Sequence, residues 1–247
     1  MSCILKGLLL AWITLNSWVC SVTLPQITDR RFIDDCVQEH NRARSSVNPP
    51  ASNMQHMTWD KDLAITARKW ASNCLFEHNP SRAHPKFTSV GENIWTGYPP
   101  SIFEATSAIK SWDDEKQHYN YSSQACSKMC GHYTQVVWAS SNKVGCAANL
   151  CPGGVKESGF GTKEGVIFVC NYAPAGNVNR RKPYESKGSA CSGCEGTCVN
   201  NLCSTERTSE SGSNYVAVLV VRPIALILTF IAAYAVKHFY PDIFCYE

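Results

Sequence analysis

Four residues of this 247-residue sequence carry side chains that could bind a metal ion or move a proton: His78, Glu92, Glu115 and His132. Imidazole nitrogens together with carboxylate oxygens suit a divalent ion such as zinc. In an enzyme, Glu92, Glu115 and His132 would activate water for hydrolysis. The simpler interpretation is a set of His–Glu hydrogen bonds that satisfy a polar cleft. The sequence has no HExxH segment and no Gly-x-Ser-x-Gly elbow, so it identifies no nucleophile and favours binding over catalysis.

Two of these residues have informative neighbours. Glu115 lies three residues beyond Trp112, on the apolar face of an expected helix, where a carboxylate needs a cation, a metal or water. His78 lies four residues past Cys74, and a disulfide at Cys74 would hold this histidine in place. Glu115 is therefore the most informative acid in the sequence.

The other two lie in segments of different character. His132 is near the start of GHYTQVVW, residues 131–138, and the aromatic and β-branched residues of this segment predict a strand. Glu92 lies between a glycine and Asn-Ile-Trp, inside 79–100, which is rich in Pro, Gly, Ser and Asn and is expected to be a loop.

Three amphipathic helices and three strands are expected around these residues. The helices begin near Phe32, at Asp60 as N-cap, and at Ser101, where Glu104 completes a capping box. The strands are 131–138, 143–149 and 165–172. Helices followed by hairpin-compatible strands predict an α+β sandwich in which the helices cover an antiparallel sheet.

Four segments in order resemble the signatures of one family. They are HNRAR at 40–44, GENI at 91–94, GHYTQVVW at 131–138 and IFVCNYAPAGNV at 167–178. The sequence resembles the CAP superfamily of cysteine-rich secretory, antigen 5 and pathogenesis-related-1 proteins over residues 30–203. A short cysteine cluster followed by a hydrophobic segment makes it most similar to the glioma pathogenesis-related proteins. The resemblance implies an α-β-α sandwich with a central antiparallel sheet.

The resemblance also implies a site and a function. It places His78, Glu92, Glu115 and His132 together in a central cleft, with the two histidines as ligands of zinc or another divalent cation and the two glutamates as their partners. It implies a non-enzymatic module that binds a small hydrophobic ligand, a sterol or a fatty acid, between helices or under a loop. A protein partner is a further expectation, and a metal-dependent hydrolase or protease is the alternative.

The 14 cysteines indicate an oxidising compartment. The family pattern implies pairs of Cys74 with Cys151, Cys126 with Cys130, and Cys146 with Cys170, leaving Cys36 free. Four further cysteines crowd into a Gly/Ser-rich stretch, where two disulfides are favoured over a zinc site and the pairing stays open: Cys191, Cys194, Cys198 and Cys203.

The ends of the chain predict its processing and location. Residues 1–21 are expected to be a secretory signal peptide, 22–178 the CAP domain, 179–203 a cysteine-rich hinge and 204–214 a polar linker. The apolar segment 215–236 is expected to span the membrane, with 237–247 as a cytosolic tail of a type I cell-surface protein. A GPI-anchored or shed form is the alternative. Asn120 is an acceptor for glycosylation. The net charge of +3 has no long basic run, so nucleic-acid binding has little support.

Overall fold

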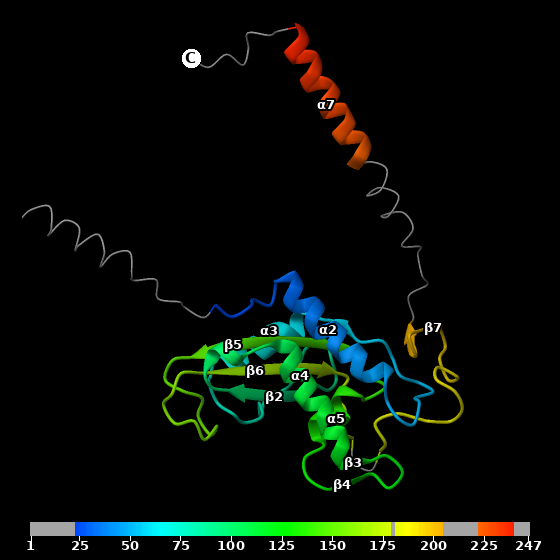
Figure 1. Cartoon of the computed structure of the whole chain (residues 1–247). Coiled ribbons are helices and arrows are strands. Elements are labelled where there is room, and N and C mark those ends of the chain that lie inside the picture. The colour runs from blue at the N-terminus through cyan, green and yellow to red at the C-terminus, as the bar shows by residue number, and fades with distance from the viewer. Residues whose placement is uncertain (1–22, 179–180, 205–221, 240–247) are drawn as a thin grey trace, which may run out of the picture. The chain divides into compact units, whose positions relative to one another are not determined.

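The computed structural model describes residues 23–178, 181–204 and 222–239 (Figure 1). A sheet lies at the centre of the described residues between 23 and 204, with strand order β1-β5-β6-β2. Its strands are β1 (Thr58–Trp59), β2 (Gly91–Gly97), β5 (Lys143–Cys151) and β6 (Gly165–Ala173). β2, β6 and β5 pair antiparallel, and the two-residue β1 joins β5 in parallel.

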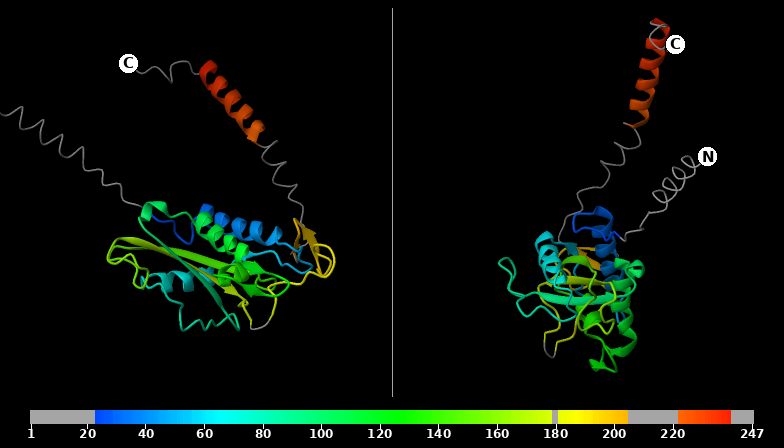
Figure 2. Two further views of the ribbon diagram at one scale, coloured as in Figure 1. Left: turned by 60° about the horizontal axis from the view of Figure 1, so that its bottom comes forward. Right: turned by 90° about the vertical axis from the view of Figure 1, so that its left-hand side faces the viewer.

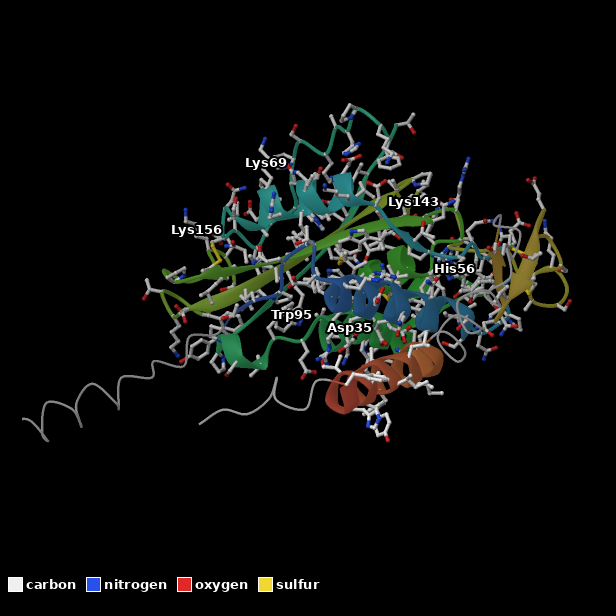
Figure 3. The ribbon with its side chains drawn as sticks, turned by 90° about the horizontal axis from the view of Figure 1, so that it is seen from above. Asp35, His56, Lys69, Trp95, Lys143 and Lys156 are labelled. Atoms are coloured by element: carbon white, nitrogen blue, oxygen red, sulfur yellow. A yellow bond between two sulfur atoms is a disulfide. The ribbon has the colours of Figure 1, made fainter. Side chains whose placement is uncertain are left out.

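Helices cover both faces of this sheet. α3 (Lys61–Ala71) packs on β5 and β6 from one side, whereas α2 (Arg30–Ser45) and α4 (Ala105–Asp114) pack together on the other side (Figure 2). Asp35 of α2 and Lys69 of α3 accordingly lie on opposite sides of the sheet (Figure 3). The predicted α-β-α sandwich is confirmed.

The central strand β6 is buried along its whole length. Because side chains alternate along a strand, Phe168, Cys170 and Tyr172 join the core under α2 and α4. Ile167 and Val169 join the separate core under α3. This double burial explains why the segment is almost wholly apolar.

The helix starts agree with the sequence in one case and not in another. The Asp60 carboxylate caps α3 by accepting from the backbone N–H groups of Asp62 and Leu63. The capping box at Ser101 is wrong, because a short 3-10 helix, η1 (Pro100–Ile102), comes first and α4 begins only at Ala105. The chain is extended at Phe103 and Glu104, which separates the two helices.

The expected loop 79–100 contains β2, so that part of the prediction is wrong. β2 pairs with β6 along seven residues, and Glu92 lies opposite Asn171. The polar residues Glu92 and Asn93 concealed the strand, although both are buried. They are tolerated there because their side chains are hydrogen-bonded.

The segment 131–138 is not a strand but contains the helix α5 (Gly131–Val136). Side chains from elsewhere satisfy the backbone groups at both of its ends. Glu115 accepts from the N–H groups of His132 and Tyr133, and buried Arg44 donates to the carbonyl groups of Val136 and Trp138. These long-range bonds override the local strand propensity.

Five disulfides hold the described part of the chain. Cys74–Cys151 links the residues after α3 to the end of β5, and Cys146–Cys170 joins opposite residues of β5 and β6. The others are Cys126–Cys130, Cys191–Cys198 and Cys194–Cys203. Cys36 is a buried free thiol.

The cysteine-rich segment packs against the domain that precedes it. Its two short strands, β7 (Thr197–Val199) and β8 (Leu202–Ser204), form a hairpin. Backbone bonds connect Cys203 to both Met54 and His56, and Leu202 is buried in the main core. The segment therefore forms one compact unit with the sandwich. The boundary at 179 stays a prediction.

The C-terminal helix overturns the expected membrane span. α7 (Arg222–Phe239) has 18 residues, about 27 Å in length, and it contains charged residues near both ends. Among the described residues, no helix is long and apolar enough to cross a membrane. The predicted type I cell-surface location is therefore wrong. The signal peptide, most of the polar linker, residues 215–221 of the predicted span and most of the predicted tail lie outside the described residues.

Candidate functional site

The His/Glu cluster, defined as His78, Glu92, Glu115 and His132, consists of two pairs. In the first pair, His78 Nδ1 donates to Glu92 Oε1 over 2.9 Å. The Glu92 side chain is fully buried and also accepts from the Asn79 N–H at 2.9 Å and from Asn171 Nδ2 at 3.2 Å. The His78 side chain is 56% exposed, so its ring is held through Nδ1 by a buried carboxylate and is otherwise open to solvent.

The second pair is built in the same way. Glu115 follows α4 and begins the 3-10 helix η2 (Glu115–His118). Its Oε1 accepts from His132 Nδ1 at 2.6 Å, and its Oε2 accepts from the backbone N–H groups at the start of α5. The imidazole of His132 stacks on Trp112, with ring centroids 6.0 Å apart. The hydrogen bond to Glu115 and the stacking on Trp112 hold the His132 ring in one orientation.

A buried hydrogen-bond network links β2, which carries Glu92, to the start of α5, which carries His132. Asn93, which follows Glu92 on β2, donates from Nδ2 to the His132 carbonyl at 3.1 Å and to the Tyr172 hydroxyl at 3.3 Å. Tyr172 in turn donates to His40 Nε2 at 2.8 Å, because His40 Nδ1 is already bonded to the Cys36 carbonyl. Burial lowers the pKa of His40 to about 4, so its ring is neutral.

Sequence reasoning missed the supporting residues Asn93, Tyr172 and Asn171. All three lie inside the motifs GEN and CNY, which could have signalled them. It identified the four residues of the His/Glu cluster, and the structure shows two hydrogen bonds, His78 with Glu92 and His132 with Glu115. That the four form one metal site stays a prediction. Neither glutamate is free, because each accepts backbone N–H as well as imidazole N–H.

A carboxylate can accept but not donate, so Nδ1 of each histidine carries the proton and the Nε2 lone pair is available to a metal ion. Each imidazole could therefore ligate a divalent ion. Among the described residues, the His/Glu cluster holds no three ligand atoms that lie within 4.8 Å of one another. Such an ion would complete its shell with water.

A group of cysteine sulfurs also lies within 4.8 Å of one another: Cys191, Cys194 and Cys203. All three are bonded in disulfides: Cys191 pairs with Cys198, and Cys194 pairs with Cys203. A disulfide sulfur is not a thiolate, so this group does not suit zinc.

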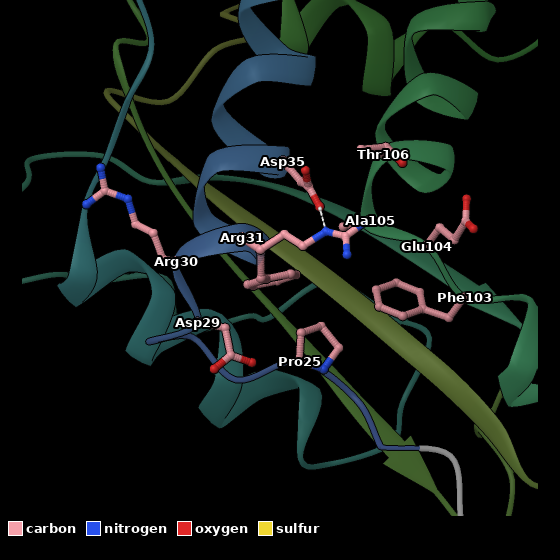
Figure 4. Close-up of a pocket in the computed structure, with 10 residues that line it drawn as sticks. Pro25, Asp29, Arg30, Arg31, Asp35, Phe103, Glu104, Ala105 and Thr106 are labelled. Atoms are coloured by element: carbon pink, nitrogen blue, oxygen red, sulfur yellow. Dashed lines mark ion pairs between the residues drawn. The ribbon is translucent and has the colours of Figure 1, made fainter. Parts of the chain in front are cut away.

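A pocket of about 600 Å³ lies outside the cluster, between the start of α2 and the start of α4 (Figure 4). Phe32 and Phe103 supply aromatic surface, and both rings pack near Phe168 of the core, at 6.2 and 5.4 Å between centroids. The Arg31 guanidinium extends across the pocket and forms an ion pair with Asp35 at 3.8 Å. No local sequence pattern indicates this pocket, because its walls come from two segments about 70 residues apart, 25–35 and 103–106.

The predicted glycosylation acceptor lies on the surface. Asn120 is exposed in the short strand β3 (Tyr119–Asn120), which pairs with β4 (Ala125–Cys126). Its Oδ1 accepts from the Ser123 N–H at 3.0 Å, and glycosylation at this position stays a prediction.

The arrangement can be compared with known proteins. A model of the cysteine-rich secretory protein family, CAP, matches residues 37–172. The chain belongs to the CAP family. Glioma pathogenesis-related protein 1 of Mus musculus is 43% identical over 243 residues, which cover 90% of this chain and 89% of that protein. GLIPR1-like protein 1 of Bos taurus is 47% identical over 193 residues, which cover 76% and 77% of the two chains. These relatives confirm the resemblance stated above.

Solved CAP-fold structures are similar to this chain. Na-ASP-1 has a TM-score of 0.57 and 25% identity, over 76% of this chain and 50% of that one. The crystal structure of NaASP2 with Zn2+ has a TM-score of 0.55 and 28% identity, over 74% of this CAP chain and all of the other. The zinc ion belongs to that protein.

Proposed function

We propose that this CAP protein is an extracellular, non-enzymatic module that binds a small amphiphilic lipid, a fatty acid in preference to a sterol. The pocket between α2 and α4 carries the proposal. Its volume of about 600 Å³ is within the range of small-molecule sites, roughly 300–1,000 Å³. An extracellular location is supported by the five disulfides.

The lining has the two kinds of surface that an amphiphile needs. Phe32 and Phe103 offer rings against which an alkyl chain would bury apolar area. The ion pair of Arg31 with Asp35 is long, at 3.8 Å, and the Arg31 side chain is exposed, so its guanidinium is available to a ligand carboxylate. A sterol carries no anionic group, and for this reason the lining favours a fatty acid.

Fatty-acid binding is tested with a radiolabelled long-chain fatty acid and the purified protein. We expect Thr106→Trp, which fills the pocket from α4, to abolish binding, and Arg31→Gln to weaken it severalfold. Arg68→Gln is the control, because Arg68 is exposed on α3, on the other side of the sheet, and does not line the pocket. Undiminished binding by Thr106→Trp would rule out this pocket. A protein partner captured in the absence of any lipid binding would favour the interaction-domain alternative.

A second candidate function, binding of a divalent cation, is favoured by the His/Glu cluster. Each histidine is oriented by a carboxylate on Nδ1, which is the arrangement that raises imidazole basicity toward a metal on Nε2. The related NaASP2 was crystallised with Zn2+. His78 and His132 would hold the ion, and Glu92 and Glu115 would orient them.

Titration calorimetry with zinc chloride at neutral pH tests this second candidate. We expect uptake by the wild type and its loss in His78→Ala/His132→Ala, with His84→Ala as the control histidine. Unchanged zinc uptake in the double variant would show that the four residues form a structural hydrogen-bond network and not a metal site. The alternative function, a metal-dependent hydrolase, would be supported by a hydrolytic activity of the wild type that is lost in His132→Ala.

A further inference from the structure

A second pocket lies apart from the α2–α4 pocket and has a volume of about 260 Å³. It is formed where the C-terminal part of α2, the end of α4, β3 and α5 meet. Its polar and aromatic lining consists of Ser46, Asn48, Asp113, Lys116, Tyr119, Tyr121 and Tyr133. None of these residues belongs to the His/Glu cluster.

Asp113 supplies a buried carboxylate to this pocket, with a side chain only 1% exposed. Its Oδ2 accepts from Lys116 Nζ at 2.8 Å and from Arg42 Nη2 at 3.3 Å. Its Oδ1 has no hydrogen-bond partner among the described residues. A buried acceptor without a donor is costly, so the pocket favours a ligand that donates to this oxygen.

Three tyrosines surround this carboxylate with aromatic surface. The rings of Tyr119 and Tyr133 lie 5.9 Å apart at 58°, which makes two walls that face in different directions. The chain already places an ammonium group on the third ring, because Lys182 Nζ lies 4.3 Å from the centroid of Tyr121. Electron-rich ring faces attract cations, and several of them together recognise ammonium groups.

We propose that this pocket binds an organic ammonium group, whose N–H donates to Asp113 Oδ1 while its alkyl part contacts the tyrosine rings. An anionic ligand would meet the buried carboxylate and be repelled. The ammonium can belong to a small free amine or to a lysine side chain of a partner protein.

The charges around Asp113 determine how strongly such a ligand binds. Arg42 is held by Glu39 through bonds of 2.6 to 3.0 Å, so its charge is already balanced. Lys116 is 47% exposed and is the resident ammonium on Asp113. Its charge repels the ammonium group of the ligand, and its removal therefore strengthens binding.

The test uses n-butylammonium chloride, with tyrosine ring shifts in the NMR spectrum of the whole protein as the readout. We expect saturable shifts at millimolar concentration, a loss of about tenfold in affinity for Asp113→Asn, and a severalfold gain for Lys116→Met. Lys110→Met is the matched control, because Lys110 bonds Asp114 on the same helix and does not line the pocket.

Two further probes identify the ligand class. n-Butanol has a similar size without the charge, and equal binding of n-butanol would overturn the ammonium assignment. Nα-acetyl-lysine N-methylamide represents a lysine of a partner protein, and tighter binding of this probe than of n-butylammonium identifies a protein as the source. No saturable shifts with either amine, or weaker binding by Lys116→Met, would also overturn the proposal. The Lys116 variant keeps the test decisive even if Asp113→Asn does not fold.

Discussion

Both glutamates of the His/Glu cluster orient other groups and are not free ligands. Glu92 accepts from one imidazole, one backbone N–H and one amide, and Glu115 accepts from one imidazole and two backbone N–H groups. Each carboxylate thereby uses three of its roughly four acceptor positions, whereas each imidazole keeps its Nε2 lone pair. This division of roles follows from contacts and not from residue type.

At the scale of single residues, we predict that buried His40 makes the protein less stable in acid. Its folded-state pKa of about 4 is below the unfolded value near 6.5, so the unfolded chain binds the proton more strongly. Burial of the neutral His40 ring makes its full contribution to the free energy of unfolding above about pH 6.5, and this contribution is lost as the pH falls toward 4. The loss approaches about 3 kcal/mol.

Urea unfolding at a series of pH values between 7.5 and 4.5 measures this effect. The free energy of unfolding of His40→Gln is expected to be lower at neutral pH and to change less over this window than that of the wild type. Equal pH dependence of the two proteins would show that His40 does not contribute.

At the scale of elements, α5 depends on charged residues from other helices. We predict that Glu115→Ala lowers the free energy of unfolding by about 3 kcal/mol, because it leaves the N–H groups of His132 and Tyr133 without their acceptor. Glu104→Ala is the control, since this exposed carboxylate accepts from the nearby Ser107 hydroxyl and caps no helix. Similar losses in both variants, measured by urea unfolding, would contradict the capping role.

The contact between α3 and the sheet gives a second prediction at this scale. A Cβ at Gly145 would collide with the backbone of Asp60, Leu63 and Ala64, which cannot move without displacing the start of α3. Gly145→Ala is therefore expected to destabilise the fold by at least about 2 kcal/mol. Gly153→Ala, where a Cβ meets nothing within 4 Å, should be close to neutral in the same thermal-unfolding assay.

At the scale of the whole molecule, disulfides tie the layers together. Cys146–Cys170 closes a loop with a sequence separation of 24 between the two central strands. We predict that Cys146→Ser costs about 3 kcal/mol and sharply reduces the secreted yield. Cys36→Ala serves as the control because Cys36 is buried but unpaired. Equal yields of the two variants would argue against a stabilising role for this bond.

Several features of this protein follow from its sequence alone. The apolar periodicity at 3.6 residues predicted α2 and α3, and the strand-like segments predicted β5 and β6, because these elements bury their own apolar residues in a regular pattern. The sequence also named the four residues of the His/Glu cluster through the family motifs. A local pattern is sufficient to predict an element when the spacing of its apolar residues matches the face that the element buries.

The tertiary structure decided the rest, for a common physical reason. β2 exists because Glu92 and Asn93 find partners across β6, and α5 is helical because Glu115 and Arg44 satisfy its ends. Both groups of partners lie far away in the sequence, so no local window contains them. The conformational propensity of a residue contributes about a few tenths of a kcal/mol to the free energy of folding. A buried backbone group without a hydrogen-bond partner costs about 1–3 kcal/mol. The long-range hydrogen bonds therefore determine the local conformation.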